Sequence, residues 1–85
     1  MPRRTVADPV AQAFGDAVRE ARTARSETLE DVAARIPSDG RGKRTTMDPR
    51  YLGEIELGWH APSIVRAKQL ADALGVPLSD LVRDL

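Results

Sequence analysis

Basic side chains gather in one short polar stretch of this 85-residue chain. The run SDGRGKRTTMD, residues 38–48, holds Arg41, Lys43 and Arg44 beside two glycines. Residues 35–50 together carry five basic side chains against two acidic ones, although the formal net charge of the whole chain is zero. Because a polyanion meets the field of one face rather than the sum over the molecule, this pattern favours binding to phosphates.

Other kinds of chemistry lack the residues that they need. The chain has no cysteine and a single histidine, His60, which leaves no thiolate or His/Cys cluster for a metal and no evident nucleophile with a base. The segment GRGKRT lacks the first glycine of a nucleotide-binding phosphate loop, and no strand precedes it. We therefore expect no enzyme activity, no metal, no cofactor and no small-molecule ligand.

Length and composition predict one small soluble domain. The chain is 41% hydrophobic and 31% charged, and it has no apolar run near the length of a membrane span. The segment MPRRTVADPV lacks the apolar core of a secretory signal, so a cytoplasmic location is expected. A core of this size gives limited stability, which favours a partner.

Start and stop signals predict five helices. Asp8 and Pro9 can cap and open the first helix, which should run to about Ala24. The later signals are a capping box at Thr28 and Asp31, a stop at Pro37, a second Asp-Pro pair at Asp48 and Pro49, a stop at Gly58, a cap at Ser63, a stop at Gly75 and an opening Pro77. Strand signals are absent. The prediction is an all-α domain of five helices over residues 9–85, preceded by a flexible arm over residues 1–8.

Each predicted helix has one apolar face at helical spacing. The residues expected to point inward in the first four helices are Val10, Phe14, Val18, Ala21, Leu29, Val32, Ala33, Ile36, Leu52, Ile55, Ile64, Ala67, Leu70, Ala71 and Leu74.

Three segments carry a resemblance to a known family. TLEDVAARI, YLGEIELG and PSIVRAKQLADALGVPLSDL resemble the DNA-binding domain of the Cro and lambda-repressor-like family, also called the xenobiotic-response-element type, over about residues 13–82. The resemblance implies a helix-turn-helix in the middle of a five-helix domain. In this family an Arg late in the first helix pairs with a Glu near the end of the recognition helix. The matching residues are Arg22 and Glu56, so a partly buried ion pair is implied.

The chain departs from this family in the turn, where residues 37–47 form an insertion. One reading is a solvated surface loop. We favour a clamp on the DNA backbone or a minor-groove arm, because the loop leads into the start of the recognition helix. The predicted backbone contacts are Thr28, Arg41, Lys43, Arg44, Thr45, Thr46 and Tyr51.

By position in the family, base edges should face Pro49, Arg50, Gly53 and Glu54. Arg50 can reach O6 and N7 of guanine, and Glu54 can accept from cytosine N4. Pro49 and Gly53 cannot form side-chain hydrogen bonds. In the free protein, Arg50 and Glu54 are expected to pair, because they lie four residues apart on one helix.

The resemblance also implies a twofold dimer on a palindromic operator. The predicted dimer surface is Val76, Leu78, Leu81, Val82 and Leu85, of which at least half should belong to the core. For Trp59 the readings, in order, are a lid over the core, a dimer contact and a contact at the DNA edge.

These observations predict a sequence-specific, homodimeric transcriptional regulator that binds double-stranded DNA in a prokaryotic cytoplasm or nucleoid, as a repressor or an activator-repressor. Restriction-modification controllers and phage-type repressors have this size and plan. The alternatives are an antitoxin-type regulator and a helical protein-interaction module that has lost DNA binding. The second alternative is suggested by Pro49, Gly53, Trp59 and the neutral net charge.

Overall fold

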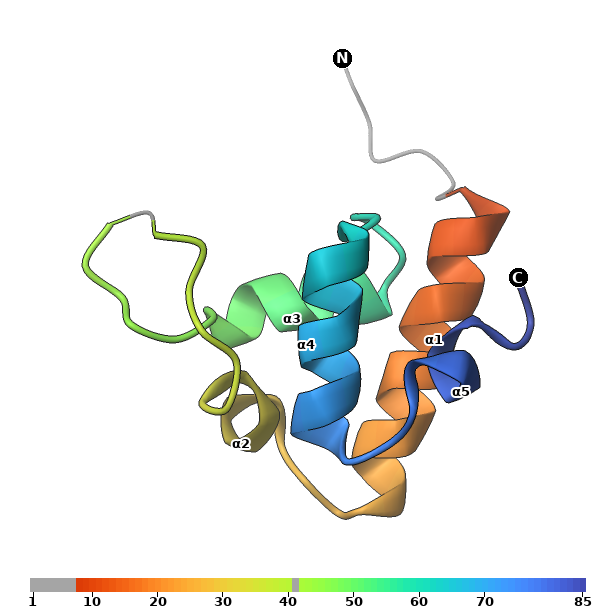
Figure 1. The fold of residues 1–85 in the computed structure, drawn as a ribbon, viewed down its shortest axis with the longest axis horizontal. Coiled ribbons are helices and arrows are strands. Elements are labelled where there is room, and N and C mark those ends of the chain that lie inside the picture. Colours follow the sequence, from red (N-terminus) through yellow and green to blue (C-terminus); the bar gives the residue numbers. More distant parts are fainter. Residues whose placement is uncertain (1–7, 41) are drawn as a thin grey trace.

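The computed structural model describes residues 8–40 and 42–85 as five helices (Figure 1). They are α1 (Pro9–Ala24), α2 (Leu29–Ala33), α3 (Pro49–Glu56), α4 (Ile64–Leu74) and α5 (Leu78–Val82). Within this part of the chain no strand forms, and an isolated antiparallel bridge joins Pro37 to Thr46. The all-α, five-helix prediction is confirmed. The predicted arm lies outside the described residues up to residue 7.

Side-chain caps begin four of the five helices as the sequence predicts. Asp8 accepts a hydrogen bond from the amide of Val10 at 2.8 Å, and Asp48 accepts one from the amide of Arg50 at 2.9 Å. Ser63 caps α4, and α2 carries the predicted capping box. Hydrogen bonds from Thr28 hold the pKa of Asp31 below its ordinary value of 3.8. Each cap satisfies amides that would otherwise lack a partner at the helix start.

The core lies where α1, α3, α4 and α5 meet, with α2 packed on α3 and α4. Its fully buried large side chains are Val18, Val32, Ile36, Leu52, Ile55, Leu70, Leu74 and Leu81. The second helix is shorter than predicted, because it ends at Ala33 and Ile36 reaches the core from the turn that follows.

Two residues predicted to point inward lie outside this core. Val10 is 55% exposed and Ile64 is 70% exposed. Both belong to the first turn of their helix. These two predictions are wrong because the apolar stripe of each helix continues one turn beyond the point where the other helices cover it.

A close approach between α1 and α3 depends on Gly15. A Cβ atom at this position would lie 2.3 Å from the carbonyl oxygen of Ile55 and 2.7 Å from that of Glu56. Both contacts are with backbone atoms, which a side-chain rotation cannot relieve. The glycine therefore sets the distance between α1 and the carboxyl end of α3.

We predict that Gly15→Ala destabilises the fold by about 1–3 kcal/mol, because the two helices must separate to admit a methyl group. The loss is expected although alanine favours an isolated helix by about 1 kcal/mol over glycine. Thermal unfolding measures it. Gly53→Ala is the matched control, because its Cβ would meet only the end of the Leu29 side chain, at 3.4 Å. Equal stabilities for Gly15→Ala and wild type would contradict the close approach.

Candidate nucleic-acid interface

An ion pair holds the carboxyl end of α3 against α1. Arg22 Nε lies 2.7 Å from Glu56 Oε2, and Arg22 Nη2 lies 2.8 Å from Glu56 Oε1. The side chains are 14% and 6% exposed. The hydrogen bond to Glu56 raises the pKa of Arg22 above its ordinary value. This is the pair that the sequence resemblance implies, in two-pronged geometry that fixes direction as well as distance.

Arg22 also reaches the segment that leads into α2. Its Nη1 donates to the carbonyl oxygen of Glu27 at 2.9 Å. One guanidinium therefore joins the end of α1, the entrance to α2 and the end of α3. The angle between α2 and α3, and the face that α3 turns outward, depend on this junction.

The outer face of α3 is a stripe of residues at spacings of three and four. Leu52, Ile55 and Glu56 point inward. Outward, Arg50 has a side chain 85% exposed and Glu54 one that is 39% exposed, with Gly53 between them. Leu57, which caps the helix end, continues the stripe and is 54% exposed. Leu57 was not predicted from the sequence, although its place seven residues after Arg50 is a signal for the same face.

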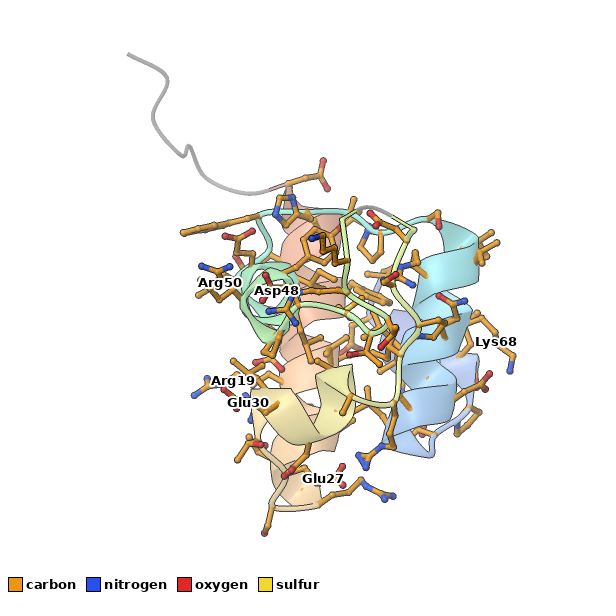
Figure 2. All side chains as sticks on the ribbon, turned by 90° about the vertical axis from the view of Figure 1, so that its left-hand side faces the viewer. Arg19, Glu27, Glu30, Asp48, Arg50 and Lys68 are labelled. Carbon is orange, nitrogen blue, oxygen red and sulfur yellow. The ribbon has the colours of Figure 1, made fainter. Side chains whose placement is uncertain are left out.

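The predicted pairing of Arg50 with Glu54 is wrong. Arg50 Nη2 instead lies 3.1 Å from Asp48 Oδ2 (Figure 2). Asp48 is already fixed as the helix cap, two residues away, so it offers a placed carboxylate. The hydrogen bond from Arg50 lowers the pKa of Asp48 below 3.8, and the same contact raises the pKa of Arg50.

Glu54 has a different partner from the one predicted. Its Oε1 lies 2.7 Å from His60 Nε2. The chain reverses after α3 at Gly58, whose φ of 81° suits glycine, and the amide of Trp59 bonds back to the carbonyl of Glu54 at 3.0 Å. This turn brings His60 beside Glu54. The His60 ring also stacks on Tyr51, with centroids 4.8 Å apart.

The loop between α2 and α3 has two arms joined by backbone hydrogen bonds, and it projects away from the helices (Figure 1). Ser38 donates its amide to the carbonyl of Thr45 at 3.0 Å, and Met47 donates to that of Ile36 at 2.8 Å. Met47 is 3% exposed and anchors the returning arm in the core. The sequence reasoning did not identify this anchor.

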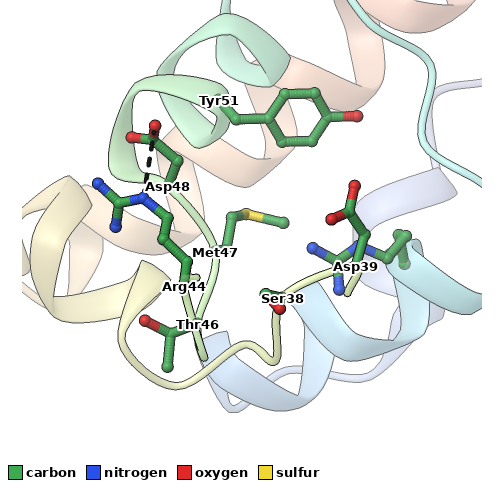
Figure 3. A pocket seen from close by; sticks show the side chains of 8 residues that line it. Ser38, Asp39, Arg44, Thr46, Met47, Asp48 and Tyr51 are labelled. Carbon is green, nitrogen blue, oxygen red and sulfur yellow. Dashed lines mark ion pairs between the residues drawn. The ribbon is translucent and has the colours of Figure 1, made fainter. Parts of the chain in front are cut away.

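The predicted loop contacts occupy the outer part of this connection. Lys43, Arg44 and Thr45 are exposed, and Thr46 is half-buried. Arg41 lies outside the described residues. Arg44 Nε lies 3.7 Å from Asp48 Oδ2, the same carboxylate that binds Arg50 (Figure 3). Asp48 therefore brings a cation of the loop and a cation of α3 to one place.

A pocket lies between this loop, the start of α3 and α4 (Figure 3). Its lining mixes both charges and three hydroxyl side chains: Ser38, Asp39, Arg44, Thr46, Met47, Asp48, Tyr51 and Arg66. Arg66 donates to the carbonyl of Pro37 at 2.6 Å, so α4 braces the outgoing arm of the loop. The other predicted backbone contact, Thr28, is exposed at the cap of α2, where its hydroxyl accepts from Asp31.

The predicted dimer surface is largely core. Leu81 is 2% exposed, which corrects its assignment to an interface. Val76, Leu78 and Val82 are half-buried and packed on the core, and Leu85 is 51% exposed. Of these residues, Leu78, Leu81 and Val82 belong to α5, which packs on α1 and α4, whereas Val76 and Leu85 flank the helix. Trp59, 39% exposed, lies outside the core cluster, which disfavours its reading as a lid.

A different apolar surface opens between the starts of α1 and α4 and the end of the chain. Its most exposed members are Val10, Ile64 and Leu85. The groove between them is lined by Val10, Ala11, Phe14, Ala61, Pro62, Ile64, Ala67, Val82 and Leu85. We call this the apolar groove. No helix among residues 8–40 and 42–85 is long and apolar enough to cross a membrane.

The comparison with solved structures decides the family. No family model and no curated protein matches the sequence. The restriction-modification controller protein C.AhdI from Aeromonas hydrophila is 31% identical, with a TM-score of 0.68 over 84% of this chain and 94% of that one. The S. venezulae BldD DNA-binding domain is also 31% identical, with a TM-score of 0.68 over 88% of this chain and 99% of that one. The chain belongs to the lambda-repressor-like family of helix-turn-helix regulators.

A third structure, the clp gene regulator ClgR from C. glutamicum, is 26% identical, with a TM-score of 0.73 over 89% of this chain and 87% of that one. Within this helix-turn-helix family the α2–α3 pair is the motif, and α3 is the recognition helix. The family resemblance given by the sequence is confirmed. In this helix-turn-helix protein the Arg22–Glu56 pair joins the recognition helix to the scaffold.

We predict that Glu56→Ala destabilises the domain by about 3 kcal/mol or more, because it leaves the largely buried guanidinium of Arg22 without its partner. In a domain of this size such a loss lowers the melting temperature by more than about 10 °C. Thermal unfolding followed by circular dichroism measures it. Asp72→Ala is the control, since it breaks an exposed pair with Lys68, and it should change stability by less than about 1 kcal/mol. Similar shifts for both variants would contradict the role of the pair.

Proposed function

We propose that this protein is a homodimeric transcriptional regulator that reads double-stranded DNA with α3. The observation that carries the proposal is the exposed stripe of α3, which presents Arg50 and Glu54 beside the cations of the loop. The fold is that of DNA-binding regulators, among them the restriction-modification controller C.AhdI. That protein matches over 94% of its own length, which supports a regulator of the controller kind.

Base readout is assigned to the first turns of α3 and to its end. Arg50 leaves Asp48 and donates to O6 and N7 of a guanine, while Glu54 accepts from the N4 amine of a cytosine. Leu57 is placed to contact a thymine methyl group. Pro49 and Gly53 contribute no side-chain hydrogen bond, and the missing side chain of Gly53 lets the helix approach the bases closely.

Backbone contacts are assigned to the loop and its surroundings. Lys43 and Arg44 bind phosphates, with Thr45, Thr46, Thr28 and Tyr51 as hydroxyl donors. Arg41 belongs to the same proposal. The neutral net charge is compatible with this role because Arg44 and Arg50 can leave Asp48 on binding, Arg44 for a phosphate and Arg50 for a guanine. DNA as partner fits a place in the cytoplasm or nucleoid of a prokaryote.

We assign the dimer contact to the apolar groove and place a second copy of the chain there. One recognition helix reads only a few base pairs, so a palindromic operator needs two helices about 34 Å apart. The domain measures 32 × 30 × 23 Å, so two copies side by side give a spacing of that order. Ala61 and Pro62 of the groove lie only a few residues after α3, which supports a contact near the recognition helix. Leu85 and Val82 remain from the surface predicted by sequence.

A helical protein-interaction module without DNA binding is the second candidate. The apolar groove and the acidic partners of the basic side chains favour it. In that case the groove binds another protein and the α3 stripe has no base to read.

Selection from a pool of random duplex DNA, with sequencing of the bound fraction, tests the function. We predict enrichment of a palindromic site and an affinity that falls steeply as salt rises, since each neutralised phosphate adds about 0.9 to the log–log slope. In the double variant Lys43→Ala, Arg44→Ala the slope should fall by about 1.8 for each protomer, and therefore by about 3.6 for the proposed dimer. The control is Lys68→Ala, an exposed cation on α4 paired with Asp72. Weak binding without an enriched sequence would favour the interaction module. An unchanged salt slope in the double variant would show that the loop is a solvated surface that does not bind DNA.

We predict that Ile64→Glu makes the protein monomeric and lowers operator affinity while the domain remains folded. Ile64 is 70% exposed, so a carboxylate there disturbs little in the monomer but is desolvated in the proposed dimer. Sedimentation equilibrium measures the oligomeric state. Ala34→Glu, exposed at the end of α2, is the control. A dimer that persists in Ile64→Glu would exclude the groove as its interface.

A further inference from the structure

The two side chains proposed to read bases are held by separate partners. Arg50 is bound by Asp48, and Glu54 is bound by His60. At a spacing of four residues on one helix, Arg50 and Glu54 would otherwise pair with each other. Such a pair would occupy the guanidinium and the carboxylate before either met a base.

The position of His60 is fixed by the backbone turn before it and by ring stacking. The reversal at Gly58 ties Trp59 back to the carbonyl of Glu54, which leaves His60 over the last turns of α3. Its ring stacks on Tyr51 at an interplanar angle of 28°, and Tyr51 is itself packed on the core. The imidazole is therefore part of the scaffold, although it is about one third exposed.

This placement affects one oxygen of Glu54 and leaves the other available. His60 Nε2 faces Oε1 at 2.7 Å, and within the described residues no hydrogen bond engages Oε2. A carboxylate held through one oxygen has a fixed rotamer, and its second oxygen keeps its capacity to accept from an amine. Part of the rotamer freedom that Glu54 would lose on meeting a base is already restricted in the free protein, which lowers the cost of the contact.

We infer that His60 is a positioning residue that determines base preference by holding Glu54 away from Arg50 and toward cytosine. The inference rests on the proposed DNA-binding function and assigns specificity to a residue that lies outside the recognition helix. The ring acts through Glu54 and needs no contact with DNA of its own.

Two substitutions separate the hydrogen bond from the ring stacking. His60→Phe keeps a ring on Tyr51 and removes the hydrogen bond, whereas His60→Gln loses the stacking but retains a donor of similar reach. Glu54→Ala identifies the operator position that Glu54 reads. For each variant, affinity is measured on a set of duplexes that carry all four bases at each operator position, together with the melting temperature.

Wild type should prefer cytosine at the Glu54 position by about five-fold or more. We expect this preference to fall toward one in His60→Phe, with an unchanged salt slope, and to be largely retained in His60→Gln. If His60→Phe lowers the melting temperature by more than a few degrees, His60→Ala and His60→Gln are compared at a temperature where both are folded. At that temperature we expect the cytosine preference to be lost in His60→Ala and largely retained in His60→Gln.

A cytosine preference that survives in both His60→Phe and His60→Ala would overturn the inference, as would a preference lost equally in His60→Gln. Glu54→Ala with unchanged preference at every position would also overturn it, because Glu54 would not read a base. In each of these cases the wild type still selects an operator, so the proposed function stands. Failure of the wild type to bind any duplex would instead remove both.

Discussion

The ion pair between Arg22 and Glu56 is the interaction on which the rest of the structure depends. It lies at the junction of α1, the entrance to α2 and the end of α3, and it is almost closed to solvent. The geometry demands a close approach of α1 and α3, which Gly15 permits. A charged pair in this place fixes the orientation of α3 against α1, which apolar contacts alone would leave variable. The recognition helix is thereby presented with one face inward and one outward.

Acidic side chains organise the basic surface of this protein. Asp48 caps α3 and at the same time binds Arg44 and Arg50, and Glu54 is held by His60. Asp48 gathers two exposed guanidinium groups at the start of α3, although the chain as a whole has zero net charge. The pairs that Arg44 and Arg50 form with Asp48 are exposed and therefore weak. A phosphate or a base can therefore replace the carboxylate at little cost.

Much of the fold was predictable from local chemistry. The starts of four helices follow from caps at Asp8, Thr28, Asp48 and Ser63, because a cap acts within its own turn. The family resemblance supplied the Arg22–Glu56 pair.

The features that the sequence did not predict are contacts that depend on the path of the chain. Glu54 pairs with His60 because the turn at Gly58 folds back, and helical spacing alone favoured Arg50. Ile64 is exposed because the helix extends beyond its neighbours, which periodicity cannot indicate. Met47 is a core residue in a segment that reads as loop.

The most direct test of the account is a map of backbone amide chemical shifts on addition of an operator duplex. The account predicts the largest changes at residues 42–57, on α3 and the loop before it, with small changes at residues 78–82. Changes centred on the apolar groove, with residues 50–57 unaffected, would contradict the assignment of α3 as the reading helix.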